Sequence, residues 1–196
     1  MVFAWMFLAS TGIILSKFYR RLMPSKHICG YPVWFPFHVL IAIGVVCFSI
    51  AGFVLILYER NWKWNSDLLP INFAHSIMGI IGIGGACLQF LYSICRPSLG
   101  SSVRDVFNKI HSLIGHFAFL FANIAILIAL FIKRVHLGWV PTGIMMGWLV
   151  WLFLVFSTLE ILKYFDNRCK FIKIKFLYLY LISLNVFLLN LRCSYD

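Results

Sequence analysis

Three histidines stand near the ends of long hydrophobic segments: His38, His75 and His111. An ionisable side chain inside a membrane is costly, so each of these residues is a candidate for a functional site. A neutral imidazole is also a leading axial ligand of haem iron. The alternative to a functional site is that each ring only contacts lipid headgroups, as a lone histidine at a membrane surface often does. The position of each histidine within its hydrophobic segment distinguishes between these interpretations.

The composition is that of a membrane protein. Hydrophobic residues make up 62% of the 196 positions and charged residues 12%, whereas a soluble domain has about half and about a quarter. The net charge of +11 comes from basic residues that flank apolar runs. This pattern predicts a lipid bilayer as the partner and excludes nucleic acid. The six cysteines form no C-x-x-C pair, so neither a zinc site nor a disulfide framework is indicated.

The apolar runs predict the fold. A bilayer core of about 30 Å needs roughly 20 residues of helix, and six segments approach this length. We therefore expect an all-α fold, a multi-pass bundle of six transmembrane helices with a four-helix core. The chain forms one predicted domain over residues 1–196, with the core in about 1–165. The six segments are Met1 to Phe18, Phe35 to Tyr58, Ile71 to Ile94, Val106 to Ile132, Trp139 to Leu162 and Phe176 to Leu191.

The loop charges predict the orientation of the bundle. Twelve of the 17 basic residues lie in or beside the loops after the first, third and fifth segments, and five lie on the other side. Positive charge collects on the cytosolic side, so these three loops are expected to be cytosolic and the N-terminus to face outside. The sequence does not indicate which membrane is involved.

This orientation pairs two of the three histidines. His38 and His111 each lie about one turn into a segment that begins in the cytosol, which puts both about 5–8 Å inside the boundary. Two imidazoles at equal depth on separate helices can ligate one iron from opposite faces. His75 begins a segment that starts outside, so it cannot share that iron. His116 lies about 140° round the helix from His111. We expect His116 to bond between helices and keep it as the fallback ligand.

Small and polar residues inside the segments indicate how the helices meet. Four glycines in the third segment predict either close helix packing or a flat surface for a macrocycle, and these readings are compatible. Three amide side chains are expected to form hydrogen bonds between helices. The residues are Gly79, Gly82, Gly84 and Gly85 for the first set, and Gln89, Asn108 and Asn123 for the second.

Several stretches together resemble the cytochrome b561 domain of ferric-chelate-reductase-like and DOMON-linked proteins. The likeness covers the first five segments well and the sixth loosely. No single stretch is specific, but their order and spacing are. They read W-M-F-L-A-S-T-G-I at 5–13, W-F-P-F-H at 34–38, H-S-I-M-G at 75–79, L-Q-F-L at 88–91, R-P at 96–97 and R-D-V-F-N-K-I-H-S-L-I-G at 104–115.

The resemblance implies a ligand set. The family binds two b-type haems through four histidines on four successive helices, the first with the third and the second with the fourth. Matched by motif, the second-helix ligand is His38, the third is His75 and the fourth is His111. The family's first ligand, a His-Gly pair, falls just before Met1, so His75 lacks an evident partner and Met1 is a poor substitute. The expectation is a chain truncated at its N-terminus, or a divergent form, holding one haem.

The resemblance also implies a function. We expect one-electron transport by b-type haem, with ascorbate as cytosolic donor and a ferric chelate as acceptor, which would make the chain an oxidoreductase. Lys109 and Arg104 could attract an anionic donor, although anchoring at the membrane surface explains them equally well. The alternative is a non-enzymatic membrane protein or an inactive fragment of a larger reductase, with one haem or none. A homodimer is compatible with either.

Overall fold

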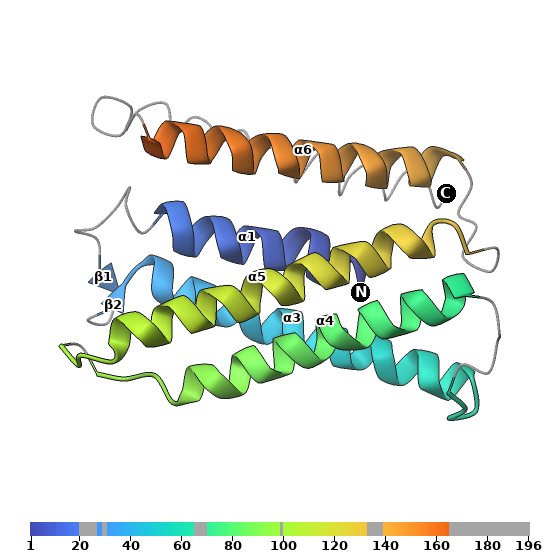
Figure 1. Cartoon of the computed structure of the whole chain (residues 1–196), viewed down its shortest axis with the longest axis horizontal. Coiled ribbons are helices and arrows are strands. Elements are labelled where there is room, and N and C mark those ends of the chain that lie inside the picture. The colour runs from blue at the N-terminus through green and yellow to red at the C-terminus, as the bar shows by residue number, and fades with distance from the viewer. Residues whose placement is uncertain (20–26, 29–30, 65–69, 99, 133–138, 165–196) are drawn as a thin grey trace. The chain divides into compact units, whose positions relative to one another are not determined.

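The computed structural model describes residues 1–19, 27–28, 31–64, 70–98, 100–132 and 139–164. Four of its helices are long and apolar enough to cross a membrane. They are α3 (Trp34–Glu59), α4 (Pro70–Ile94), α5 (Arg104–Ala129) and α6 (Trp139–Tyr164), shown in Figure 1. Their bounds agree with the second to fifth predicted segments to within three residues at every end. The helical class and the multi-pass character are therefore confirmed.

The first predicted segment is helical but shorter than a standard span. It consists of η1 (Phe3–Ala9), α1 (Ser10–Ile14) and η2 (Leu15–Tyr19), and both η elements are π-helical. The sixth predicted segment, at 176–191, lies outside the described residues. The fold also contains a small element that hydropathy did not suggest: β1 (His27–Ile28) pairs antiparallel with β2 (Tyr31–Pro32). The described residues thus form four full-length spans, whereas the whole sequence predicted six.

The chain divides into two compact units. The first contains Met1–Ala9 and Val39–His136, and the second contains Ser10–His38 and Leu137–Asp196. In the first unit, α4 and α5 lie side by side and run in opposite directions (Figure 1). A Cβ atom placed on Gly85 would lie 2.8 Å from Cβ of Ala118, and one on Gly82 would lie 3.0 Å from Cβ of Ala122. Glycine at these positions lets the two backbones approach closely.

A second antiparallel contact in the first unit joins η1 to α3. A Cβ on Gly44 would meet Leu8, one on Gly52 would meet Met1, and the ring of Phe3 packs edge-on against that of Phe48. These pairs run in opposite directions along the two helices. In η1, four consecutive residues from Ala4 to Phe7 are buried, so the middle of this short helix is buried all round, whereas Phe3 at its start is 42% exposed.

The second unit contains α1, η2 and α6. The buried residues of α6 recur every three or four positions, as one face of a helix requires, at Met145, Trp148, Leu152, Val155 and Leu159. Lys17 of η2 forms an ion pair with Glu160 of α6. The two side chains keep roughly a third or more of their surface exposed, at 35% and 41%. The pair therefore joins the first helical segment to α6 near the chain's predicted cytosolic side.

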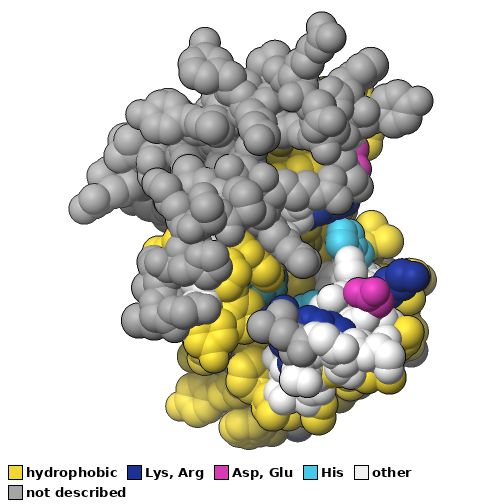
Figure 2. Space-filling view, turned by 90° about the vertical axis from the view of Figure 1, so that its left-hand side faces the viewer, with side chains coloured by type: hydrophobic (Ala, Val, Ile, Leu, Met, Phe, Trp, Pro, Cys, Tyr) yellow, Lys and Arg dark blue, Asp and Glu magenta, His cyan; other side chains and the backbone are white. Residues whose placement is uncertain are grey.

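Large hydrophobic side chains are exposed along every long helix. Leu40 and Leu55 of α3 are 65% and 66% exposed, and Phe153 of α6 is 71% exposed. Figure 2 shows hydrophobic side chains over much of the described surface on one face, with charged side chains confined to a small part of it. A soluble protein rarely exposes such extended apolar surface. Along helices of membrane length it is the surface that faces lipid.

Candidate haem-ligand site

His38 lies in the first two turns of α3, and its ring is oriented by a backbone carbonyl. Nδ1 of His38 lies 3.0 Å from the carbonyl oxygen of Gly12. A carbonyl only accepts hydrogen bonds, so Nδ1 of His38 donates, and in the neutral form of the ring Nε2 would then carry the lone pair. Metal-binding histidines typically donate their second ring N–H to a carbonyl or a carboxylate in this way. The donor chemistry of His38 therefore fits an axial ligand.

His75 in α4 has the same arrangement with a different carbonyl. Its Nδ1 lies 2.9 Å from the carbonyl oxygen of Ala125 on α5. Gly79 follows His75 by one helical turn and so shares its face of α4. A Cβ placed on Gly79 would meet nothing within 4 Å. The helix surface beside the His75 ring is thus open, as a macrocycle resting there would require.

His111 in α5 sits in a stack of rings at the α4–α5 contact. Its ring lies 5.9 Å from that of Phe107 at an interplanar angle of 14°, and Phe107 stacks on Tyr92 of α4 at 4.5 Å. The backbone carbonyl of His111 accepts a hydrogen bond of 2.7 Å from Nε2 of Gln89. Aromatic stacking and this bond fix His111 against α4.

The predicted ligands divide between the units. His75 and His111 lie in the first unit, and His38 lies in the second. The pairing of His38 with His111 stays a prediction. No group of three or more His, Cys, Asp or Glu residues that could hold a metal ion occurs among the described residues. A haem needs only two axial ligands from the protein, so its site would not form such a group.

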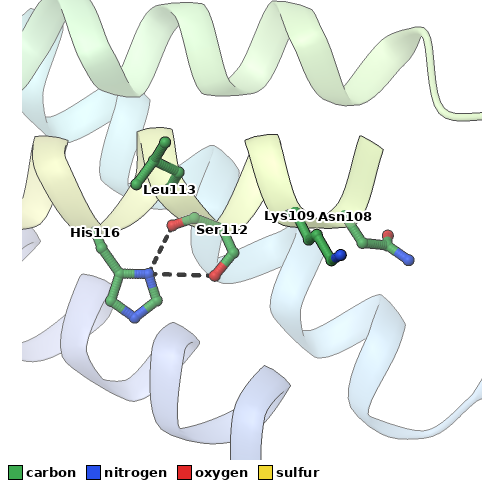
Figure 3. Close-up of a pocket in the computed structure, with 5 residues that line it drawn as sticks. All are labelled: Asn108, Lys109, Ser112, Leu113 and His116. Carbon is green, nitrogen blue, oxygen red and sulfur yellow. Dashed lines mark hydrogen bonds between the residues drawn. The ribbon is translucent and has the colours of Figure 1, made fainter. Parts of the chain in front are cut away.

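His116 lines a pocket on a different face of α5. The pocket is shallow and widely open to solvent, with a volume of about 500 Å³, and its described lining residues are Asn108, Lys109, Ser112, Leu113 and His116 (Figure 3). Nδ1 of His116 lies 2.6 Å from the carbonyl oxygen of Ser112, one turn earlier in the same helix. The prediction that His116 bonds between helices is therefore wrong for this nitrogen. Its ring is held by its own helix and is exposed.

Some of the glycines and amides make the contacts predicted for them, and others do not. Gly82 and Gly85 pack closely against α5, whereas a Cβ on Gly79 or Gly84 would meet nothing within 4 Å. Close packing is therefore confirmed for Gly82 and Gly85, whereas a macrocycle surface at Gly79 and Gly84 stays a prediction. The interhelical bond expected of Gln89 is confirmed.

Asn123 behaves differently from Gln89. Its Nδ2 donates to the carbonyl of Phe119 in its own helix, so the expectation of an interhelical bond is wrong for that group. Sequence reasoning also missed the carbonyls of Gly12 and Ala125 as partners of the histidine rings. No residue type marks such a carbonyl, because every residue carries one.

Comparison with known proteins identifies relatives of the chain. The family described as "Eukaryotic cytochrome b561" matches residues 1–137. Ferric-chelate reductase 1 of Mus musculus is 28% identical over 153 residues, and ferric-chelate reductase 1 of Homo sapiens is 25% identical over 154 residues. Each alignment covers 77% of this chain and 25% of the relative. The chain thus spans about a quarter of the length of these curated relatives. No solved structure matches it.

These similarities agree with the structure. The family implies binding of b-type haem, and the relatives support a role in transmembrane electron transport. The four membrane-length helices agree with a membrane-embedded protein. The matched residues include His38, His75 and His111 and cover about two thirds of the chain. The chain belongs to the eukaryotic cytochrome b561 family.

Proposed function

We propose that the protein carries single electrons across a membrane, as an ascorbate-dependent, ferric-chelate-reductase-like cytochrome. His38 and His111 hold a b-type haem near the cytosolic side, and His75 is a ligand on the outer side. The names of the relatives support the choice of a ferric chelate as acceptor. The family motifs and the equal predicted depth of His38 and His111 support the ligand pairing.

The observation that carries the proposal is the orientation of the His38 ring. Its Nδ1–H is committed to the carbonyl of Gly12 at 3.0 Å, which leaves Nε2 as the coordinating nitrogen. The same arrangement at His75, with Ala125, supports its assignment on the other side of the membrane. A headgroup contact would require neither the fixed tautomer nor a carbonyl from another helix.

The ligand set limits the chemistry of the site. A b-type haem supplies reversible one-electron chemistry when it is bound. His38 and His111 would hold the haem iron between them and would leave no position on it for O₂ or substrate. The apolar helices that carry the two rings limit access of water. The protein thus positions and insulates an electron carrier and leaves proton chemistry to the donor.

Lys109 is the best candidate for attracting the anionic donor. It is exposed at the pocket in Figure 3, and it forms no ion pair or hydrogen bond with the described residues. Arg104 is less suitable, because its guanidinium already donates to the carbonyl of Pro97 at 2.9 Å. Asn108 and Ser112 add polar groups beside Lys109. An anion such as ascorbate would find a cation and hydrogen-bonding groups there.

The haem-to-protein ratio of the purified protein tests this proposal. A b-type spectrum at a ratio of one or two, reduced by ascorbate, supports it, and so does reduction of a ferric chelate on the opposite side of proteoliposomes. A ratio of zero overturns it in favour of a haem-free membrane protein. Lys109→Gln should raise the ascorbate concentration for half-maximal reduction about fivefold, since one charge pair at 4 Å in water contributes about 1 kcal/mol. Lys63→Gln removes an equal charge from the turn after α3 and should change nothing.

A further inference from the structure

Gln89 of α4 contacts the helical turn that carries His111. Its Nε2 donates to the backbone carbonyl of His111 at 2.7 Å. The carboxamide lies against Gly115, where a Cβ would come within 3.0 Å of Nε2. Gly115 follows His111 by one turn, so both residues present the same face of α5 to Gln89. Glycine at position 115 leaves room for the amide, since a larger residue would require the carboxamide to shift by a few tenths of an ångström.

The other end of the same carboxamide is unsatisfied. Oε1 of Gln89 is buried and has no hydrogen-bond partner within the described part of the chain. Leaving a buried acceptor without a partner costs about 1–3 kcal/mol, and native proteins do so rarely. A buried, unpaired carbonyl oxygen next to an imidazole residue therefore calls for an explanation. Packing alone does not give one, because a leucine would fill the same space without that cost.

We propose that Gln89 is the positioning residue of His111, its Oε1 accepting the Nδ1–H of that imidazole while the ring's Nε2 binds iron. This inference rests on the proposed function and deepens it. At His38 and His75 the same role belongs to a backbone carbonyl of another helical segment, that of Gly12 and that of Ala125. On α5 a side-chain amide takes the place of that carbonyl. One carboxamide then holds both the backbone and the ring of His111.

A hydrogen bond to the far nitrogen makes an imidazole a stronger donor to iron. Stronger donation favours ferric over ferrous iron and lowers the reduction potential. Gln89→Glu should therefore lower the midpoint potential of one haem, and Gln89→Leu should raise it. Because the carboxylate of Gln89→Glu also lowers the potential through its negative charge, the rise in Gln89→Leu is the shift that a merely structural role does not predict. Asn123→Leu is the matched control, since it removes a buried amide that bonds its own helix, and it should leave the potential unchanged.

Gly115→Ala gives an independent test. Its Cβ would push the carboxamide aside by a few tenths of an ångström, so this variant should shift the potential slightly in the direction of Gln89→Leu while all donors and acceptors remain. If Gln89→Leu fails to retain haem, Gly115→Ala decides the sign. The inference is overturned if the Leu and Glu substitutions shift the potential equally or not at all in protein whose haem depends on His111. If the unaltered protein binds no haem, or if His111→Ala retains all of it, the proposed ligand set is wrong as well.

Discussion

At the scale of single residues, the histidines differ in what holds their Nδ1–H groups. His38 and His75 donate to carbonyls of other helical segments, whereas His116 donates to a carbonyl one turn away in its own helix. A bond across helices fixes the ring relative to the bundle, and a bond within one helix fixes it only relative to that helix. This difference favours His38 and His75 as ligands and makes His116 a suitable control.

Replacement of either proposed inner ligand should remove that haem. In His38→Ala or His111→Ala the iron keeps one strong axial ligand, so most of the inner haem should be lost on purification. His116→Ala should retain the full haem content. Pyridine haemochrome absorbance per protein measures the outcome. Retention in His111→Ala together with loss in His116→Ala would transfer the α5 ligand to His116.

At the scale of elements, the glycines of α4 serve two surfaces. Those at 82 and 85 meet the backbone and Cβ atoms of Ala122 and Ala118, so α4 and α5 approach closely along one line. Those at 79 and 84 border open space. This line of contact between α4 and α5 is rigid, because backbone atoms of α5 cannot move aside as the end of a flexible side chain can.

Leucine substitutions distinguish these two glycine surfaces. Gly85→Leu should wedge α4 away from α5 and destabilise the protein by about 1–3 kcal/mol, the usual cost of overpacking. Gly84→Leu is adjacent in sequence and enters open space, so it should cost far less. Thermal unfolding of both variants in the same detergent measures the difference. Equal losses of stability would show that the α4–α5 contact does not explain the effect.

The ion pair of Lys17 and Glu160 is a second contact between helices that can be tested. Glu160→Lys should lower thermal stability, because it places two cations together within helices that are otherwise apolar. Exchanging the two residues, as Lys17→Glu with Glu160→Lys, should recover much of the loss. The thermal midpoints of the single and double variants provide the comparison. A double variant no more stable than the single would mean that the attraction contributes nothing.

At the scale of the whole molecule, the four long helices and the loop charges set a topology. Cys95 is exposed and directly follows the last residue of α4, on the predicted cytosolic side. With Cys95 as the single cysteine, a membrane-impermeant maleimide should label sealed cells only after they are permeabilised. A cysteine introduced by Lys63→Cys should react without permeabilisation. The reverse pattern would invert the bundle and place His38 and His111 on the outer side.

Much of this protein follows from its sequence. Apolar length and the limits set by loop residues define α3 to α6, because both depend only on neighbouring residues. The motifs around His38, His75 and His111 likewise sufficed to indicate the family that the comparison then confirmed. The sixth segment and the single domain over 1–196 stay predictions.

The tertiary structure decided which atoms of those helices meet. Hydropathy cannot tell Gly82 from Gly84, because the rotation of a helix is set by its partner and not by its own composition. Nor could it tell that Gln89 bonds another helix while Asn123 bonds its own. The carbonyls of Gly12 and Ala125 had no signal in the sequence, since every residue carries an identical carbonyl group. Only packing selects the one that a ring nitrogen can reach.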